Sequence, residues 1–154
     1  MKTQTDYKLM NKQLAALTSN VKYEISNLAN ASALIWQCMT DLNWAGFYLM
    51  HDGHLVLGPF QGKVACTTIE IGKGVCGTAV AHDKTLLVAD VHEFPGHIAC
   101  DSASNSEIVI PIHKNGEIYG VLDIDSPVIA RFTEEDKQGL EEFVRELEFI
   151  IDGK

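Results

Sequence analysis

The first forty residues carry hydrophobic positions at the spacing of helices. One set, three or four residues apart, predicts an amphipathic helix and comprises Leu14, Leu17, Val21 and Ile25. Asn27 or Asn30 can cap a second helix. The apolar stripe of that second helix comprises Leu34, Ile35, Cys38, Met39 and Leu42. Its place on the stripe predicts that Cys38 is a small buried hydrophobic side chain, not a reactive thiol.

Short runs rich in aromatic and β-branched residues begin at Trp44 and predict strands. They read WAGFYLM, HLVLGPF, TTIEI, TLLVADV and the two halves of EIVIPIHKNGEIYGVLDID. Asp52-Gly53 and Asn115-Gly116 separate neighbouring runs, and glycine tolerates the positive φ of a tight hairpin turn. Because hairpins pair their strands antiparallel, we expect a mostly antiparallel sheet.

Two more helices are expected beside these strands. GKGVCGTAVAHDK predicts a short helix entered through glycine, and TEEDKQGLEEFVRELEFIID predicts an amphipathic one. Thr133 can cap the latter, and the acids of its first turn suit the positive end of a helix. Helices, then strands, then a helix predict an α+β domain with helices packed on one face of the sheet. We expect residues 1–154 to form a single domain.

Composition and charge narrow the partners and the compartment. The 154 residues are 46% hydrophobic and 21% charged, which is typical of a globular protein, and the net charge is −9. This charge disfavours nucleic acid and anionic membranes as partners. Neither a membrane-spanning run nor the apolar core of a signal peptide is apparent, so we expect a cytoplasmic protein. There, cysteines serve catalysis or metal binding more often than structural disulfides.

Three cysteines lie off the helical stripe. Cys66 and Cys76 follow small or apolar residues, and Cys100 lies in the long polar segment from Phe94 to Glu107. Loops of this length without an apolar pattern are usually functional or disordered. Cys76 lies near the start of the predicted short helix, where the helix dipole favours a thiolate.

The spacing of these cysteines leaves three interpretations open. They lie ten and twenty-four residues apart, without the close pairs of most zinc sites, although His97, Cys100 and His92 could form a partial one. They could also be buried and inert. The third interpretation is thiol redox chemistry, in which one thiolate attacks an electrophilic atom and another cysteine resolves the product as a disulfide.

Acidic and aromatic residues add to this chemistry. Asp123 and Asp125 share one face of a predicted strand, since side chains alternate, and Glu107 precedes the strand IVIPI. Such acids can bind an ammonium group or share a proton at a raised pKa, or they can form a solvated strand end. Trp44 and Tyr48 also share a face, either as core residues or as the wall of a pocket for a sulfur or methyl group.

The joint pattern of these segments resembles the free methionine-(R)-sulfoxide reductases, which are single GAF-domain enzymes. The likeness runs through NWAGFY, LGPFQGKVAC, GKGVCGTA, DVHEFPGHIACDSASNSEIVIPI and GVLDIDS, in that order. It implies an α+β GAF-like fold with about six mostly antiparallel strands. The N- and C-terminal helices would cover one face of the sheet, with the ligand pocket on the other. It also implies a homodimer.

The resemblance implies roles for individual residues. Cys100 resembles the attacking cysteine, Cys66 its principal resolving partner, and Cys76 a further redox-active cysteine. The acids resemble substrate-binding and proton-handling groups, and Trp44 resembles a wall of the methyl-sulfoxide pocket. The expected site therefore comprises Cys100, Cys66, Cys76, Trp44, Tyr48, Glu107, Asp123 and Asp125, without a metal.

The implied reaction is reduction of free L-methionine (R)-S-oxide to L-methionine. An acid protonates the sulfoxide oxygen, Cys100 attacks the sulfur, and the resulting sulfenic acid condenses with a second cysteine. Thioredoxin or a similar dithiol would reduce that disulfide, and no bound cofactor is expected. The alternative from another class is a GAF sensor that binds a small molecule or senses redox state without turnover.

Overall fold

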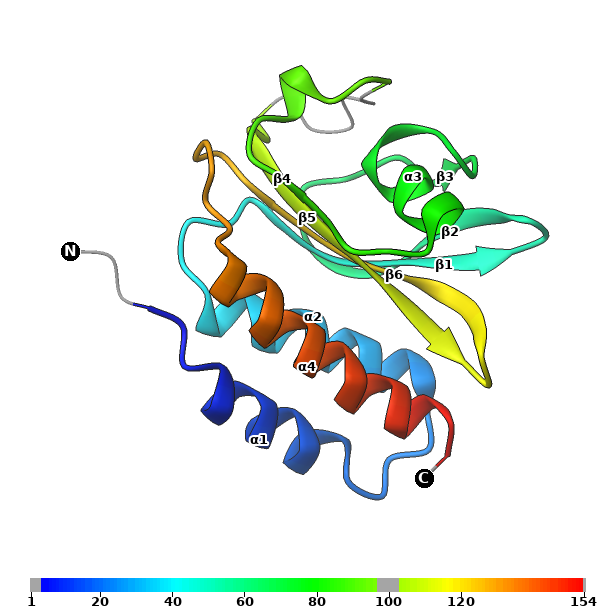
Figure 1. Ribbon diagram of the computed structural model, residues 1–154. Helices are drawn as coiled ribbons and strands as arrows, with labels where there is room; N and C mark the ends of the chain where they lie inside the picture. The colour runs from blue at the N-terminus through cyan, green and yellow to red at the C-terminus, as the bar shows by residue number, and fades with distance from the viewer. Residues whose placement is uncertain (1–3, 97–102, 154) are drawn as a thin grey trace.

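A six-stranded antiparallel sheet forms the centre of the computed structural model, which describes residues 4–96 and 103–153 (Figure 1). The strand order is β3-β2-β1-β6-β5-β4, and every neighbouring pair in this order is antiparallel. The strands are β1 Trp44–His51, β2 His54–Gly62, β3 Thr68–Ile69, β4 Leu86–Val88, β5 Ser106–Lys114 and β6 Glu117–Ser126. The predicted α+β class and antiparallel sheet are confirmed.

The helices divide between the two faces of the sheet. Helices α1 (Tyr7–Thr18), α2 (Glu24–Cys38) and α4 (Glu134–Ile151) pack together on one face, and α3 (Gly74–His82) lies on the other (Figure 1). A single 3-10 turn, Val91–Glu93, follows β4. Alternate strand residues point to opposite faces of the sheet and form two hydrophobic cores. Phe47 and Ile108 belong to the core on the side of the three helices, and Tyr48 and Val109 to the core on the side of α3.

Both predicted hairpin turns are present, and their backbone explains the residue types. Asp52 and Gly53 have φ values of 51° and 83°, and Asn115 and Gly116 have values of 53° and 83°. Two successive positive φ angles match the twist of antiparallel strands, and asparagine, aspartate and glycine tolerate them best. The turns thus fix the register of β1 with β2 and of β5 with β6.

The predicted apolar face of the first helix is confirmed at Leu14 and wrong at Leu17, Val21 and Ile25. Helix α1 ends at Thr18, and its buried residues are Met10, Leu14 and Thr18, whereas Leu17 is 45% and Ile25 71% exposed. The three buried residues are four positions apart, so they lie on one face of a helix that has 3.6 residues per turn. Burial of Thr18 is tolerated because its hydroxyl donates to the backbone oxygen of Leu14 at 2.8 Å.

The predicted caps of the second helix are also wrong. Helix α2 begins one turn earlier than expected, with Tyr23 at the N-cap, so Asn27 and Asn30 lie within it. The Asn27 side chain instead donates to the backbone oxygen of Val21 at 3.0 Å and ties the helix to the preceding turn. Cys38, the last residue of α2, is only partly buried, but it packs against the core on the helical face as expected.

The C-terminal helix matches its prediction. Thr133 and Asp136 form a capping box, and the buried side chains of α4 include Leu140, Phe143 and Leu147.

Strand β5 begins at Ser106, so Glu107 belongs to the sheet rather than to the loop that precedes it. Among the described residues, no helix has the length and apolar character needed to span a bilayer.

Candidate active site

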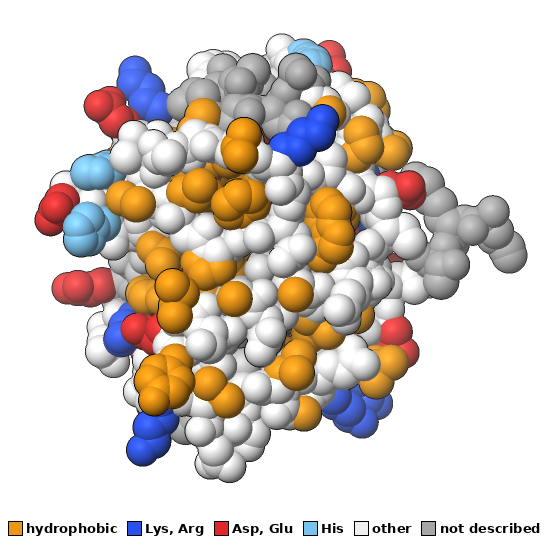
Figure 2. Space-filling view, turned by 180° about the vertical axis from the view of Figure 1, so that it is seen from behind, with side chains coloured by type: hydrophobic (Ala, Val, Ile, Leu, Met, Phe, Trp, Pro, Cys, Tyr) orange, Lys and Arg blue, Asp and Glu red, His pale blue; other side chains and the backbone are white. Residues whose placement is uncertain are grey.

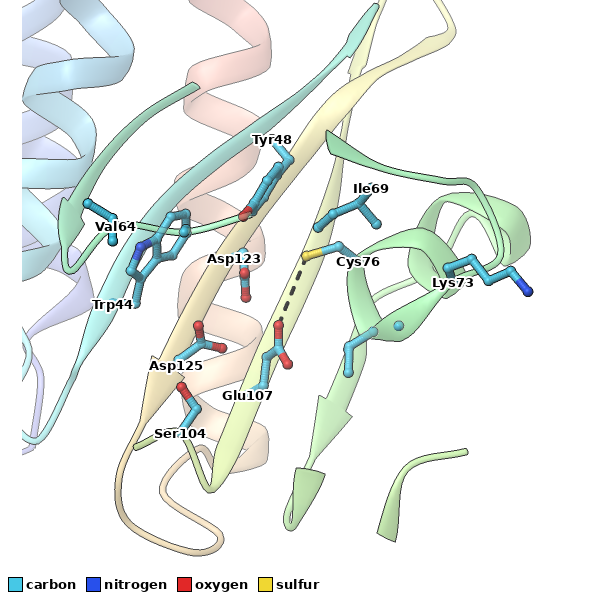
Figure 3. Close-up of a pocket in the computed structure, with 13 residues that line it drawn as sticks. Trp44, Tyr48, Val64, Ile69, Lys73, Cys76, Ser104, Glu107, Asp123 and Asp125 are labelled. Atoms are coloured by element: carbon cyan, nitrogen blue, oxygen red, sulfur yellow. Dashed lines mark hydrogen bonds between the residues drawn. The ribbon is translucent and has the colours of Figure 1, made fainter. Parts of the chain in front are cut away.

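The three predicted acids meet on one face of the sheet because of strand pairing. Glu107 on β5 lies directly opposite Asp125 on β6, and Asp123 lies opposite Val109. Asp123 and Asp125 point to the same side because they are two residues apart. Figure 3 shows all three carboxyl groups in a pocket between the aromatic residues of β1 and helix α3.

Cys76 brings a thiol to these acids. It is the third residue of α3, is 4% exposed, and its Sγ lies 4.0 Å from Oε2 of Glu107. The turn that precedes α3 packs closely on the helix because residue 77 is glycine, where a Cβ would lie 2.3 Å from the backbone oxygen of Glu70. The sequence expectation that Cys76 adjoins the start of a helix is therefore confirmed.

The expected thiolate character of Cys76 is wrong. Burial raises the pKa of this thiol well above its ordinary value, and the charges of Asp123 and Glu107 raise it further. Desolvation and the neighbouring carboxylates outweigh the stabilisation that the start of a helix gives to a thiolate. Cys76 is a protonated thiol near neutral pH.

The acids hold a proton for the same physical reasons. Burial raises the pKa of Glu107 well above its usual range, followed by the charges of Asp123 and Asp125. Burial also raises the pKa of Asp123, although hydrogen bonds from Glu107 and Cys76 oppose that rise. With its pKa raised in this way, Glu107 can carry the proton that a bound oxygen needs.

One oxygen of the cluster lacks a partner within the described part of the chain. Oδ1 of Asp123 is buried there without a hydrogen bond, in a residue that is 5% exposed. A buried acceptor of this kind carries a free-energy cost unless a ligand or water donates to it. This oxygen indicates that a hydrogen-bond donor completes the pocket.

Trp44 and Tyr48 are both core residues and pocket wall. Each is 2% exposed, and their rings stack with centroids 5.7 Å apart. Trp44 also stacks on Phe60, with centroids 5.0 Å apart. The two interpretations that the sequence left open for these aromatics are thus both correct, since the two side chains belong to the pocket-side core and also line the cavity.

The cysteines differ in state. Cys66 is disulfide-bonded and partly buried at the pocket-side core, whereas Cys38 and Cys76 are free thiols. Cys100 and His97 lie outside the described residues. A disulfide at Cys66 is what the thiol redox interpretation expects of a resolving cysteine.

A metal could be held by a different set of residues from the one considered in the sequence. The sulfur of Cys76 and one oxygen each of Glu107 and Asp123 lie within 4.8 Å of one another. The trio contains no histidine, and its members are far apart in sequence, so spacing could not identify it. Carboxyl groups in such a pocket can equally bind an ammonium group.

Two further features of the pocket escaped sequence reasoning. Ser104 is 7% exposed, lines the cavity and accepts a hydrogen bond from Nδ2 of Asn43 at 3.0 Å. Helix α3 begins at Gly74 beside the cavity, and its N-cap Lys73 provides no side-chain hydrogen bond to the helix. Its first N–H groups therefore have no intrahelical acceptor. In the sequence, Gly72 and Gly74 on either side of Lys73 were the signal that could have indicated this helix start.

This combination defines a class of protein: an α+β domain of one antiparallel sheet with a small pocket, lined by a thiol and acids, on the face opposite its three long helices. The GAF domain family model matches residues 15–151. A free methionine-R-sulfoxide reductase of Escherichia coli is 54% identical over 145 residues, which cover 94% of this chain and 88% of that protein. The chain belongs to the free methionine-R-sulfoxide reductases, a family of single-GAF-domain oxidoreductases.

Solved structures agree with this assignment. The fRMsr of Staphylococcus aureus in its reduced form aligns with a TM-score of 0.94 and 51% identity, covering 98% of this chain and 99% of that chain. The free methionine-R-sulfoxide reductase from Neisseria meningitidis, in complex with its substrate, has a TM-score of 0.92 and 39% identity. That alignment covers 99% of this chain and 94% of the other.

Proposed function

We propose that this protein reduces free methionine-(R)-sulfoxide to methionine with thiols as the electron source. The observation that carries the proposal is the cluster of buried Glu107, Asp123 and Cys76 with partly buried Asp125, in which burial and the neighbouring carboxylates raise the pKa of Glu107 well above its usual range. Sulfoxide reduction needs such an acid, because oxide is a poor leaving group until it is protonated.

The proposed reaction has two covalent steps. The Cys100 thiolate attacks the sulfoxide sulfur while an acid of the cluster protonates the oxygen. The oxygen then passes as hydroxide from the methionine sulfur to the Cys100 sulfur and the new S–S bond breaks, so that methionine departs and Cys100 becomes a sulfenic acid. A second cysteine then attacks the Cys100 sulfur, the S–O bond breaks, and a disulfide and water form. A dithiol such as thioredoxin returns two electrons and restores both thiols.

Two observations support Cys66 as the principal resolving cysteine. Cys66 is disulfide-bonded, whereas Cys76 is a free thiol. The raised pKa of Cys76 also keeps it protonated, and a protonated thiol is a poor nucleophile. Cys76 is then a secondary partner that acts when Cys66 is absent.

The charges of the pocket support a free amino acid as substrate. Carboxylates of the cluster can bind its ammonium group and satisfy the unpaired oxygen of Asp123. The uncapped start of α3 offers backbone N–H groups for its carboxylate, while Figure 3 shows the Lys73 side chain pointing away from the acids. The Trp44 ring suits the methyl sulfoxide. A residue within a peptide has neither charge, so it would leave these groups unpaired.

A coupled assay tests the proposal directly. With thioredoxin, thioredoxin reductase and NADPH, free methionine-(R)-sulfoxide should cause NADPH oxidation, and a peptide containing methionine sulfoxide should not. Absence of NADPH oxidation with the free amino acid, and of methionine release in a single turnover with a chemical dithiol, would contradict the proposal. Binding without either signal would favour a sensor.

We also infer a homodimer. Large hydrophobic side chains are exposed on the helices, among them Leu17, Ile25 and Phe149. Figure 2 shows hydrophobic groups spread over the rear face of the molecule, with charged side chains mostly toward its edges. Such exposure is typical of surfaces that associate. Light scattering after size exclusion should give twice the mass of the chain, and a monomer at micromolar concentration would contradict this inference.

A further inference from the structure

The segment from Lys63 to Cys66 is tied at both ends to the aromatic side chains of β1. Nε1 of Trp44 donates a hydrogen bond to the backbone oxygen of Lys63 at 3.1 Å. The hydroxyl of Tyr48 donates to the backbone oxygen of Cys66 at 2.9 Å. The segment follows β2 and precedes β3, so it belongs to neither strand of the sheet. Side chains therefore hold its two ends, and the next residue, Thr67, rejoins the sheet by accepting a hydrogen bond from the N–H of Leu57 at 2.9 Å.

The two anchors are themselves rigid. Trp44 and Tyr48 are each 2% exposed, and Trp44 is stacked between Tyr48 and Phe60. The chain leaves β2 directly against the indole, since a Cβ at Gly62 would lie 2.7 Å from Cδ1 of Trp44. In contrast, Val64 between the anchors is 88% exposed and provides little packing of its own. The Tyr48 hydroxyl is thus the hydrogen-bond donor that holds the Cys66 carbonyl itself.

The hydroxyl of Tyr48 has one proton, and it is directed to the Cys66 carbonyl. The aromatic ring still lines the pocket, but this proton is committed to the segment rather than to a ligand. Burial, followed by the charges of Asp123 and Cys76, raises the pKa of Tyr48 above its ordinary value, so the hydroxyl remains a donor. The donor is thus present wherever the enzyme works near neutral pH.

We propose that Tyr48 is a positioning residue for the resolving cysteine: its hydroxyl holds the Cys66 backbone so that the Cys66 sulfur meets the sulfenic acid. The inference rests on the proposed function, in which the Cys66 thiolate attacks the Cys100 sulfur, the S–O bond breaks and water leaves. Holding both sulfurs in place raises their effective concentration for this step. Trp44 anchors the other end of the segment.

Tyr48→Phe removes the hydroxyl and keeps the ring, and Tyr119→Phe is the matched control. Tyr119 is a partly buried tyrosine of β6 that packs on the opposite core. Each variant is mixed with one equivalent of free methionine-(R)-sulfoxide and quenched at intervals. Methionine release and Cys66 disulfide formation are measured in the same samples, and sulfenic acid is trapped with a dimedone-type reagent. Thermal unfolding reports the stability of each variant.

In Tyr48→Phe, we expect the ratio of disulfide formation to methionine release to fall by about five- to tenfold, the effect of one hydrogen bond. Trapped sulfenic acid should accumulate, and Tyr119→Phe should match the wild type in both rates. Replacement of Tyr48 by 4-aminophenylalanine, which keeps an N–H donor, should recover the ratio. A purely structural role would lower the melting temperature and leave the ratio unchanged.

The outcomes separate this inference from the proposed function. Normal methionine release by the wild type, with an unchanged ratio in Tyr48→Phe, would overturn the role of Tyr48 alone. Failure of 4-aminophenylalanine to recover a lowered ratio would also overturn it. Absence of methionine release by the wild type would refute the proposed function, and this inference with it.

Discussion

At the scale of single residues, the cysteines give the sharpest division of labour. Cys100→Ser should abolish methionine release in a single turnover, because the attacking sulfur is gone. Cys66→Ser should release one equivalent of methionine and then recycle at least about tenfold more slowly, since Cys76 is buried and protonated. Quenched single-turnover and steady-state assays measure the two effects.

Cys38→Ser is the control for both substitutions. Cys38 is a free thiol at the end of α2, on the other side of the sheet from the acids. Both rates should stay at the wild-type level in this variant. Normal single-turnover release by Cys100→Ser would move the attacking role to another thiol.

We expect Glu107 to lower the stability of the folded protein and to be necessary for catalysis. Its pKa in the folded protein is raised, so the fold loses stability as the pH rises above the ordinary range of a carboxyl group. Glu107→Gln keeps a neutral side chain, so we expect the melting temperature at neutral pH to rise by about 2–4 °C. Activity should fall by about 100-fold or more, because the proton donor is lost.

The pH profile provides a second readout of the same proton. In the wild type, the rate of methionine release should decline as the pH rises through the raised pKa of the acid cluster, and Glu107→Gln should lack that decline. Glu117→Gln, at an exposed position at the start of β6, is the control and should change neither quantity. A lower melting temperature in Glu107→Gln would contradict the account of this carboxyl group.

The acids should bind an ammonium group rather than an essential metal. The alternative is a metal site, because ligand atoms of Cys76, Glu107 and Asp123 lie close enough together to hold an ion. Dialysis against a chelator should leave the rate of methionine release unchanged, as measured in metal-free buffer. Loss of activity that added zinc restores would show instead that the trio is a metal site.

At the scale of elements, His113 connects the two sides of the molecule. Its Nε2 lies 2.7 Å from Asp83 at the end of α3, and its Nδ1 lies 3.1 Å from Glu148 on α4. Burial lowers the pKa of His113, but the hydrogen bonds and charges of the two acids outweigh it, and the net pKa is raised. One side chain of β5 thereby ties a pocket-side helix to a helix on the far face.

This connection should make stability depend on pH. A raised pKa means that the contribution of His113 is complete below its unfolded value and is lost as the pH rises through the folded one. Between about pH 6 and pH 9, the melting temperature of the wild type should fall by about 1–3 °C more than that of His113→Ala, a small effect because the pair is partly exposed. His82→Ala, at an exposed site on α3, should keep the wild-type difference.

The boundaries of elements show where a local pattern is insufficient. The row from Leu14 to Ile25 has helical spacing, yet the chain turns at residues 19–23 and exposes Ile25. Hydrophobic spacing alone cannot distinguish one long helix from two short ones, because both satisfy the same period. The hairpins were predictable, since Asp52-Gly53 and Asn115-Gly116 determine their own backbone angles.

At the scale of the whole molecule, the sheet assembles the site from distant parts of the chain. Trp44, Cys76, Glu107 and Asp125 come from β1, α3, β5 and β6, and the pocket exists only because these elements lie on one face. The terminal helices cover the opposite face and leave this one for the ligand (Figure 1). The α+β GAF-like fold that the resemblance implied is thus confirmed.

The sequence by itself determined the turns, the alternation of the strands, the cap of α4 and the types of residue available for chemistry. Each of these depends on neighbours in the chain, whose geometry is set by covalent bonds and backbone angles. Only the tertiary structure decided which groups carry protons. Cys76 is near a helix start, which favours a thiolate, yet burial beside Glu107 and Asp123 keeps its proton. The pKa values follow from desolvation and from charges brought close by strand pairing, and neither exists before the chain folds.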